Sequence, residues 1–192
     1  MADNRRPLSS PHLIQDVRSR RILFVCTANI CRSPAAEYLA RDRFGSDRFV
    51  FRSAGFLESG RRPTGELIRA LDDLNVDLRP HRSYRVDVAS LRVADLILTM
   101  EGGHVQRATA MWPDAWNKIV PLREAATMLR APAVDRSTFD EFLDMVRRQR
   151  EPADYLGTQW DIADPYGRGL RFHRRSIAEI ESLIEAVFTK LR

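Results

Sequence analysis

Two residues near the N-terminus, Cys26 and Arg32, have side chains that together could bind and attack a phosphate group. A cysteine thiolate is a strong nucleophile, and the planar guanidinium of arginine binds two phosphate oxygens at once. The chain has 31 basic residues among 192, so an arginine six places after a cysteine also arises by chance. The pair therefore indicates phosphoryl chemistry only if its surroundings place both side chains on one anion.

The surroundings of this pair are a short apolar run, a turn and the start of a helix. Residues 21–26 (RILFVC) have the character of a buried strand, and residues 27–32 follow as the turn. Ser33 as N-cap and Pro34 at the first helical position predict that a helix begins there. Backbone N–H groups and the positive end of the helix dipole converge on an anion at such a place. The same groups stabilise the thiolate, so we predict that the cysteine is the nucleophile and the arginine its phosphate ligand.

The other residues of the turn support this interpretation. The Ser33 hydroxyl can donate a hydrogen bond to the Cys26 sulfur when that sulfur becomes a leaving group. Asn29 tolerates the left-handed backbone conformation that a tight anion-binding loop requires. We expect the whole loop to surround the phosphate, with these ligands: Thr27, Ala28, Asn29, Ile30, Cys31, Arg32 and Ser33.

Apolar runs that alternate with helical patterns surround this loop. Further strands are predicted at residues 48–53, 94–100 and 118–121, and helices at 63–74, 86–91, 102–111, 138–148 and 173–191. This alternation predicts an α/β fold of three layers, with a central four-stranded parallel sheet and helices on both faces. The phosphate-binding loop follows the first strand, at the edge of the sheet where such folds bind ligands.

The chain reads as a flexible N-terminal leader (1–20) and one domain (21–192), with a helical insertion near 125–158. No apolar run is long enough to insert into a membrane and no secretory signal is visible, so we expect a cytoplasmic protein. The arginines are dispersed along the chain, which argues against nucleic acid as a partner. His81, His104 and His173 have no second ligand nearby and are interpreted as surface or linker residues, so no metal site or other cofactor is predicted.

The segment VCTANICRSP, residues 25–34, resembles the phosphate loop of low-molecular-weight protein-tyrosine phosphatases. Residues 53–55 (SAG), 95–100 (DLILTM) and 164–166 (DPY) are also similar to that family. The resemblance implies hydrolysis of phosphotyrosine or other aryl phosphate monoesters through a phosphocysteine intermediate at Cys26. It also implies that phosphate-like oxyanions bind the loop and inhibit this hydrolysis.

The resemblance assigns further site residues. Asp164 would be the general acid that protonates the aryl oxide leaving group, with Asp161 as the competing candidate. Tyr166 would form an aromatic wall of the pocket, and Ser53 would brace Asn29 by a hydrogen bond. Ile30 in the loop is more similar to the tyrosine-directed members of the family.

Three alternatives remain open on the sequence. An arsenate reductase of the same fold is one, although the thioredoxin-coupled type needs two cysteines beyond the nucleophile and this chain has only Cys31. A non-catalytic phosphate-binding module is the second. The third is a phosphatase whose substrate is phosphoarginine or a small phosphometabolite.

Overall fold

The structure is a computed structural model that describes residues 19–45, 48–131, 134 and 137–191. The predicted leader, residues 1–20, therefore lies almost entirely outside the described residues. Within the described ranges, no helix is both long enough and apolar enough to span a bilayer.

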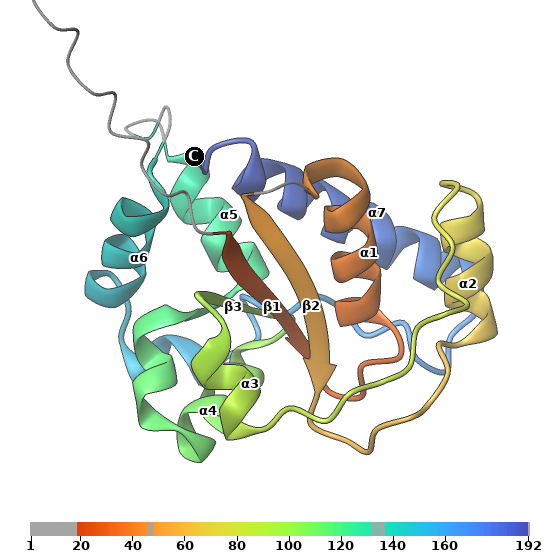
Figure 1. The fold of residues 1–192 in the computed structure, drawn as a ribbon, viewed down its shortest axis with the longest axis horizontal. Helices are drawn as coiled ribbons and strands as arrows, with labels where there is room; N and C mark the ends of the chain where they lie inside the picture. Colours follow the sequence, from red (N-terminus) through yellow and green to blue (C-terminus); the bar gives the residue numbers. More distant parts are fainter. Residues whose placement is uncertain (1–18, 46–47, 132–133, 135–136, 192) are drawn as a thin grey trace, which may run out of the picture.

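A four-stranded sheet forms the centre of the molecule (Figure 1). Its strands all run parallel, as predicted, and their order is β2-β1-β3-β4. Their bounds are β1 Arg20–Cys26, β2 Phe49–Gly55, β3 Leu96–Thr99 and β4 Ile119–Pro121. Cys26 pairs with Gly55 and Val25 with Thr99, so the carboxyl ends of three strands meet at one edge.

Both faces of the sheet are covered, which confirms the three-layer prediction (Figure 1). The side chains of β1 alternate, so Ile22 and Phe24 enter one apolar core while Leu23 and Val25 enter the other. The first core is built with α1 Arg32–Phe44, α2 Gly65–Asp72, α5 Leu122–Arg130, α6 Phe139–Arg148 and α7 Leu170–Phe188. The second is built with α3 Val88–Val93, α4 Gly102–Met111 and the 3-10 helices η1 Pro113–Lys118 and η2 Pro152–Tyr155.

Helix α1 begins two residues earlier than predicted. Its N-cap is Cys31 rather than Ser33, and no side chain caps it. The Ser33 hydroxyl is instead engaged in the loop: its oxygen accepts from Asn29 Nδ2, and its single hydrogen lies within reach of the Cys26 sulfur and the Ala54 carbonyl. The residue that looked like a helix cap therefore belongs to the loop chemistry.

The segment proposed as an insertion, residues 125–158, contributes to the main core. The predicted helix appears as α6, with Phe142 and Val146 fully buried. Helix α5 was not predicted, although Leu122, Ala125, Ala126 and Leu129 form its buried stripe, because alanines give a weak apolar signal. Farther along, the guanidinium of Arg150 is buried and donates to the Ile119 carbonyl, which fastens the end of this segment to β4.

Gly55, the last residue of β2, lies against the turn that follows β1. A Cβ atom at this position would come within 2.6 Å of the Asn29 nitrogen and 2.8 Å of the Ala28 carbonyl carbon. Both are backbone atoms, which cannot rotate away as a side chain end can. The contact between β2 and the turn therefore requires glycine.

We predict that Gly55→Ala lowers the free energy of unfolding by about 1–3 kcal/mol, because a methyl group forced into packed backbone costs that much. Urea unfolding followed by circular dichroism measures the change. Gly103→Ala in α4 is the matched control, since a Cβ there meets nothing within 4 Å. Equal stability of Gly55→Ala and wild type would contradict the close contact.

Candidate active site

The loop between β1 and α1 curls tightly at the carboxyl edge of the sheet. Asn29 has a φ of 54°, the left-handed conformation expected for it. Residues 29–33 are all buried. The Sγ of Cys31 lies 3.7 Å from Thr64 Oγ1, and burial raises the pKa of its thiol to about 12. Of the two loop cysteines, Cys31 therefore stays a protonated thiol.

The sulfur of Cys26 receives hydrogen bonds from its own loop. The backbone N–H of Asn29 lies 3.3 Å from Sγ, and the Ser33 hydroxyl donates from 3.0 Å. Donors directed at a sulfur stabilise its anionic form, which is the nucleophile. The expected contact between Ser33 and Cys26 is thus present in the structure.

The side chain of Asn29 holds the loop to neighbouring segments. Its Nδ2 donates to Ser33 Oγ at 2.9 Å and to Ser53 Oγ at 2.8 Å, and its Oδ1 accepts from the Tyr84 N–H at 2.8 Å. Ser53 in turn donates to Glu37 Oε2 at 2.7 Å. Every polar atom of the amide is used, and Ser53 braces Asn29 as the resemblance implied.

The interpretation of the three histidines as surface or linker residues was wrong. His81, His104 and His173 are 6%, 2% and 1% exposed. His81 Nε2 donates to the Asn29 carbonyl at 2.9 Å, and burial lowers the pKa of its imidazole, which keeps it neutral. His81 therefore fixes the left-handed residue of the loop from behind, a role that sequence spacing could not reveal.

Buried His104 lies beside the first residue of the turn. Its Nε2 is 3.0 Å from Thr27 Oγ1, and its ring stacks on Phe56 with centroids 5.6 Å apart. Burial, followed by the charges of Arg32 and Arg107, lowers the pKa of His104 to about 3. The imidazole is therefore neutral at physiological pH and adds no charge to the site.

Arg32 reaches from the first turn of α1 to two carboxylates. Its Nη1 donates to Glu101 Oε1 and, at 2.8 Å, to the Ile162 carbonyl, while its Nη2 donates to Asp164 Oδ2 at 2.8 Å. Sequence reasoning missed Glu101. It lies two residues after the end of β3, so the rule that sites collect at the carboxyl ends of parallel strands could have found it.

The guanidinium of Arg32 remains charged and keeps one donor unused. Burial acts to lower its pKa, but the negative charges of Cys26, Asp164 and Glu101 outweigh burial and raise it. Its buried Nε has no hydrogen-bond partner among the described residues. A phosphate oxygen seated on the loop would satisfy this donor, because Nε and one Nη form the two-pronged edge that binds oxyanions.

The two candidate acids have different positions. Asp164 lines the cavity with Cys26, and its Oδ1 also accepts from the Tyr166 N–H at 3.1 Å. Asp161 Oδ1 instead accepts from the Gly102 N–H at 2.9 Å, at the N-terminus of α4. The geometry places Asp164, not Asp161, beside the sulfur and the arginine.

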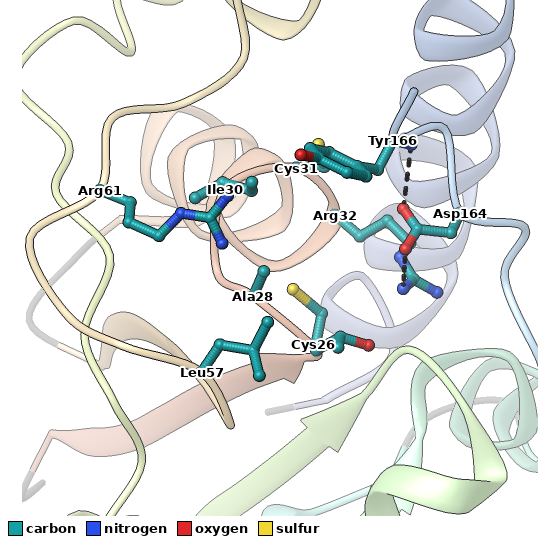
Figure 2. A pocket seen from close by; sticks show the side chains of 10 residues that line it. Cys26, Ala28, Ile30, Cys31, Arg32, Leu57, Arg61, Asp164 and Tyr166 are labelled. Atoms are coloured by element: carbon teal, nitrogen blue, oxygen red, sulfur yellow. Dashed lines mark hydrogen bonds and ion pairs between the residues drawn. The ribbon is translucent and has the colours of Figure 1, made fainter. Parts of the chain in front are cut away.

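A cavity of about 240 Å³ opens above the loop (Figure 2). Apolar side chains of Ile30 and Leu57 and the ring of Tyr166 form its walls, and Arg61 reaches in from the side opposite Tyr166. The complete lining is Cys26, Thr27, Ala28, Ile30, Cys31, Arg32, Leu57, Arg61, Asp164 and Tyr166. Leu57 and Arg61 were not predicted, although both follow β2 at the same sheet edge.

Neither a metal nor an organic cofactor is suggested by the cavity. Its polar side chains are two thiols, two hydroxyls, two guanidinium groups and a carboxylate that already binds Arg32. In the described part of the chain, no three His, Cys, Asp or Glu side chains cluster as metal ligands would. These donors suit an oxyanion instead.

Comparison with known proteins agrees with this geometry. A family model described as low molecular weight phosphotyrosine protein phosphatase matches residues 21–151. A protein-arginine-phosphatase of Geobacillus stearothermophilus is 26% identical over 172 residues, which are 90% of this chain and 96% of the relative. A low molecular weight protein-tyrosine-phosphatase of Acinetobacter johnsonii is 32% identical over 100 residues, 52% of this chain and 69% of the relative.

Solved structures lead to the same family. Wzb of Vibrio vulnificus, in complex with benzylphosphonate, is 25% identical and has a TM-score of 0.67, covering 90% of this chain and 99% of that one. The matched residues 21–151 make up more than half of the 192 and contain the whole phosphate-binding loop. The chain belongs to the low molecular weight phosphotyrosine protein phosphatase family.

Proposed function

We propose that this phosphatase hydrolyses aryl phosphate monoesters, in particular phosphotyrosine in proteins, through a phosphocysteine intermediate. The observation that carries the proposal is that one cavity joins Cys26, Arg32 and Asp164 beneath walls of apolar and aromatic side chains. Two free thiols suit a reducing compartment, so the proposed place of action is the cytoplasm.

The first half of the proposed reaction transfers the phosphoryl group to the enzyme. The Cys26 thiolate attacks phosphorus in line with the aryl oxygen, and the P–O bond breaks as the S–P bond forms. Asp164 donates a proton to the departing oxygen. Arg32 and the loop N–H groups bind the equatorial oxygens, where negative charge is spread during transfer.

The second half returns the enzyme to its starting state. The Asp164 carboxylate takes a proton from a water molecule, whose oxygen attacks the phosphocysteine. Inorganic phosphate forms, and the Cys26 thiolate leaves. Ser33 supports this step, because its hydroxyl, 3.0 Å from Sγ, stabilises the sulfur as it regains negative charge.

The walls of the cavity support an aryl substrate over phosphoarginine. A guanidine side chain needs polar partners, and the one carboxylate in the lining, Asp164, is already bound by Arg32. A phenyl ring needs apolar contact, which Ile30, Leu57 and the half-exposed Tyr166 supply. Benzylphosphonate, bound by the Vibrio vulnificus relative, also combines an aromatic ring with a phosphate-like group, and such oxyanions are proposed inhibitors here.

Phosphoarginine is the second candidate substrate, because a protein-arginine-phosphatase matches over nearly the full length of both chains. Arsenate reduction is a weaker alternative, because Cys31 is the sole thiol available for a relay and its pKa is raised to about 12. A thiol that stays protonated does not attack a sulfur-bound intermediate efficiently.

Cys26→Ser should lower kcat for p-nitrophenyl phosphate by three or more orders of magnitude, since the hydroxyl is a far weaker nucleophile than a thiolate. Arg32→Lys should lower it by about 10²–10³-fold, because an ammonium cannot bind two oxygens from one plane. Steady-state kinetics measures kcat of both variants. Wild type should be equally active with and without EDTA. Substantial activity of Cys26→Ser would contradict the proposed nucleophile.

Asp164→Asn should slow hydrolysis by about 10²–10⁴-fold for phenols that are poor leaving groups and much less for good ones. A series of substituted phenyl phosphates gives the dependence of kcat on leaving-group pKa. Asp161→Asn is the matched control, and its slope should equal that of wild type. A uniform loss across the series for Asp164→Asn would rule out its role as general acid.

A pair of peptides of one sequence, carrying phosphotyrosine or phosphoarginine at the same position, decides the substrate class. We expect kcat/KM at least about tenfold higher for phosphotyrosine, because apolar walls favour the ring and leave a guanidine unpaired. Tyr166→Ala should reduce this ratio. A phosphotyrosine/phosphoarginine ratio of kcat/KM below one would instead establish phosphoarginine as the substrate.

A further inference from the structure

Arg61 lies on the segment between β2 and α2, whose backbone is fixed in place. Its carbonyl accepts from the Ser83 N–H at 2.9 Å, and its own N–H donates to Ser83 Oγ at 3.0 Å. The preceding N–H, from Gly60, donates to the Ser83 carbonyl at 2.8 Å, and Gly60 has a φ of +87°, which favours glycine. The position from which the Arg61 side chain projects is therefore defined by the fold.

The side chain of Arg61 points into the cavity rather than along the surface (Figure 2). It enters beside Ile30, opposite Asp164 and Tyr166. Among the described residues no hydrogen bond or ion pair holds its guanidinium, although its backbone is held on both sides. The Arg61 guanidinium thus brings a positive charge to the cavity entrance, and no acidic side chain of the described residues neutralises it.

Several arginines elsewhere in the described chain have acidic partners. Arg79 pairs with Asp72 at 2.6 Å and Asp77 at 2.9 Å, and Arg174 pairs with Asp73 at 2.8 Å. Inside the cavity, Arg32 has Asp164 at 2.8 Å and Glu101 as partners. Arg61 lines the same cavity as Arg32, but it has no carboxylate partner among the described residues.

We propose that Arg61 determines sequence specificity by binding a carboxylate that flanks the phosphorylated residue of a protein substrate. This inference rests on the proposed function of the cavity. The phosphate itself is taken by the loop and Arg32, whereas Arg61 stands on the entrance wall, where residues next to the phosphorylated one pass. The planar fork of a guanidinium matches a carboxylate, so Asp or Glu beside the phosphoresidue supplies the missing partner.

The test compares three phosphotyrosine peptides that differ only in the residues on either side of the phosphotyrosine: Glu, its uncharged isostere Gln, or Lys. For wild type we expect kcat/KM to be about fivefold higher with Glu than with Gln, the size of a partly exposed ion pair. The Lys peptide should have the lowest kcat/KM of the three. Arg61→Gln should bring the Glu/Gln ratio close to one, and Arg61→Glu should invert the order of the Glu and Lys peptides.

Arg62 provides the matched control. It is the next residue on the same exposed segment and carries the same charge, but it does not line the cavity. Arg62→Glu changes the net charge as much as Arg61→Glu does, and it should keep the wild-type preference for the Glu peptide. If Arg62→Glu abolishes the preference equally, general electrostatic attraction explains it and the assignment to Arg61 is wrong.

Two further results would overturn the inference. One is a wild-type Glu/Gln ratio near one. The other is an Arg61→Gln variant that loses activity by the same factor on all three peptides and on p-nitrophenyl phosphate, which would mean that Arg61 contacts the phenyl ring. If wild type hydrolyses phosphoarginine rather than phosphotyrosine, the proposed function fails, and the Glu/Gln ratio measured on phosphoarginine peptides still decides the role of Arg61.

Discussion

The left-handed backbone at Asn29 is the constraint on which the site depends. This one residue turns the chain so that the N–H of the loop faces the Cys26 sulfur, and it costs energy for any residue but glycine. The conformation is maintained because the amide side chain binds Ser33 and Ser53, while the carbonyl accepts from His81. These partners come from three other segments, so the turn is stable only in the complete fold.

Charge balance is the second condition that the fold satisfies. A buried guanidinium is expensive unless it is paired and hydrogen-bonded, and Arg32 meets Glu101 and Asp164 within hydrogen-bond reach. Buried His104 stays neutral beside it, so the positive charge of the site centre resides on Arg32 alone. This arrangement holds the two Nη atoms of Arg32 and leaves its Nε for an oxyanion.

The features that the sequence predicted are local ones. The parallel sheet, the loop after β1 and the left-handed Asn29 follow from apolar runs and from the backbone preference of a single residue type. The place of Glu101 after β3 could have suggested a site residue, but its pairing with Arg32, 69 positions away in the chain, could not be assigned in this way. Nor could the contact of His81 with Asn29, 52 positions away. Those contacts depend on strand register and on how the loops between the elements pack, and residue spacing predicts neither.

The same distinction separates the centre of the cavity from its entrance. The segment after β2 is held by backbone groups and by the Ser83 hydroxyl, and among the described residues no hydrogen bond or ion pair to it comes from the side chains of Leu57 and Arg61. Evolution can therefore exchange these two side chains without loosening the segment or disturbing the reactive loop. A reaction centre that is held separately from its entrance would allow relatives on this scaffold to diverge in substrate by few substitutions, and it makes the entrance the natural place to re-engineer selectivity.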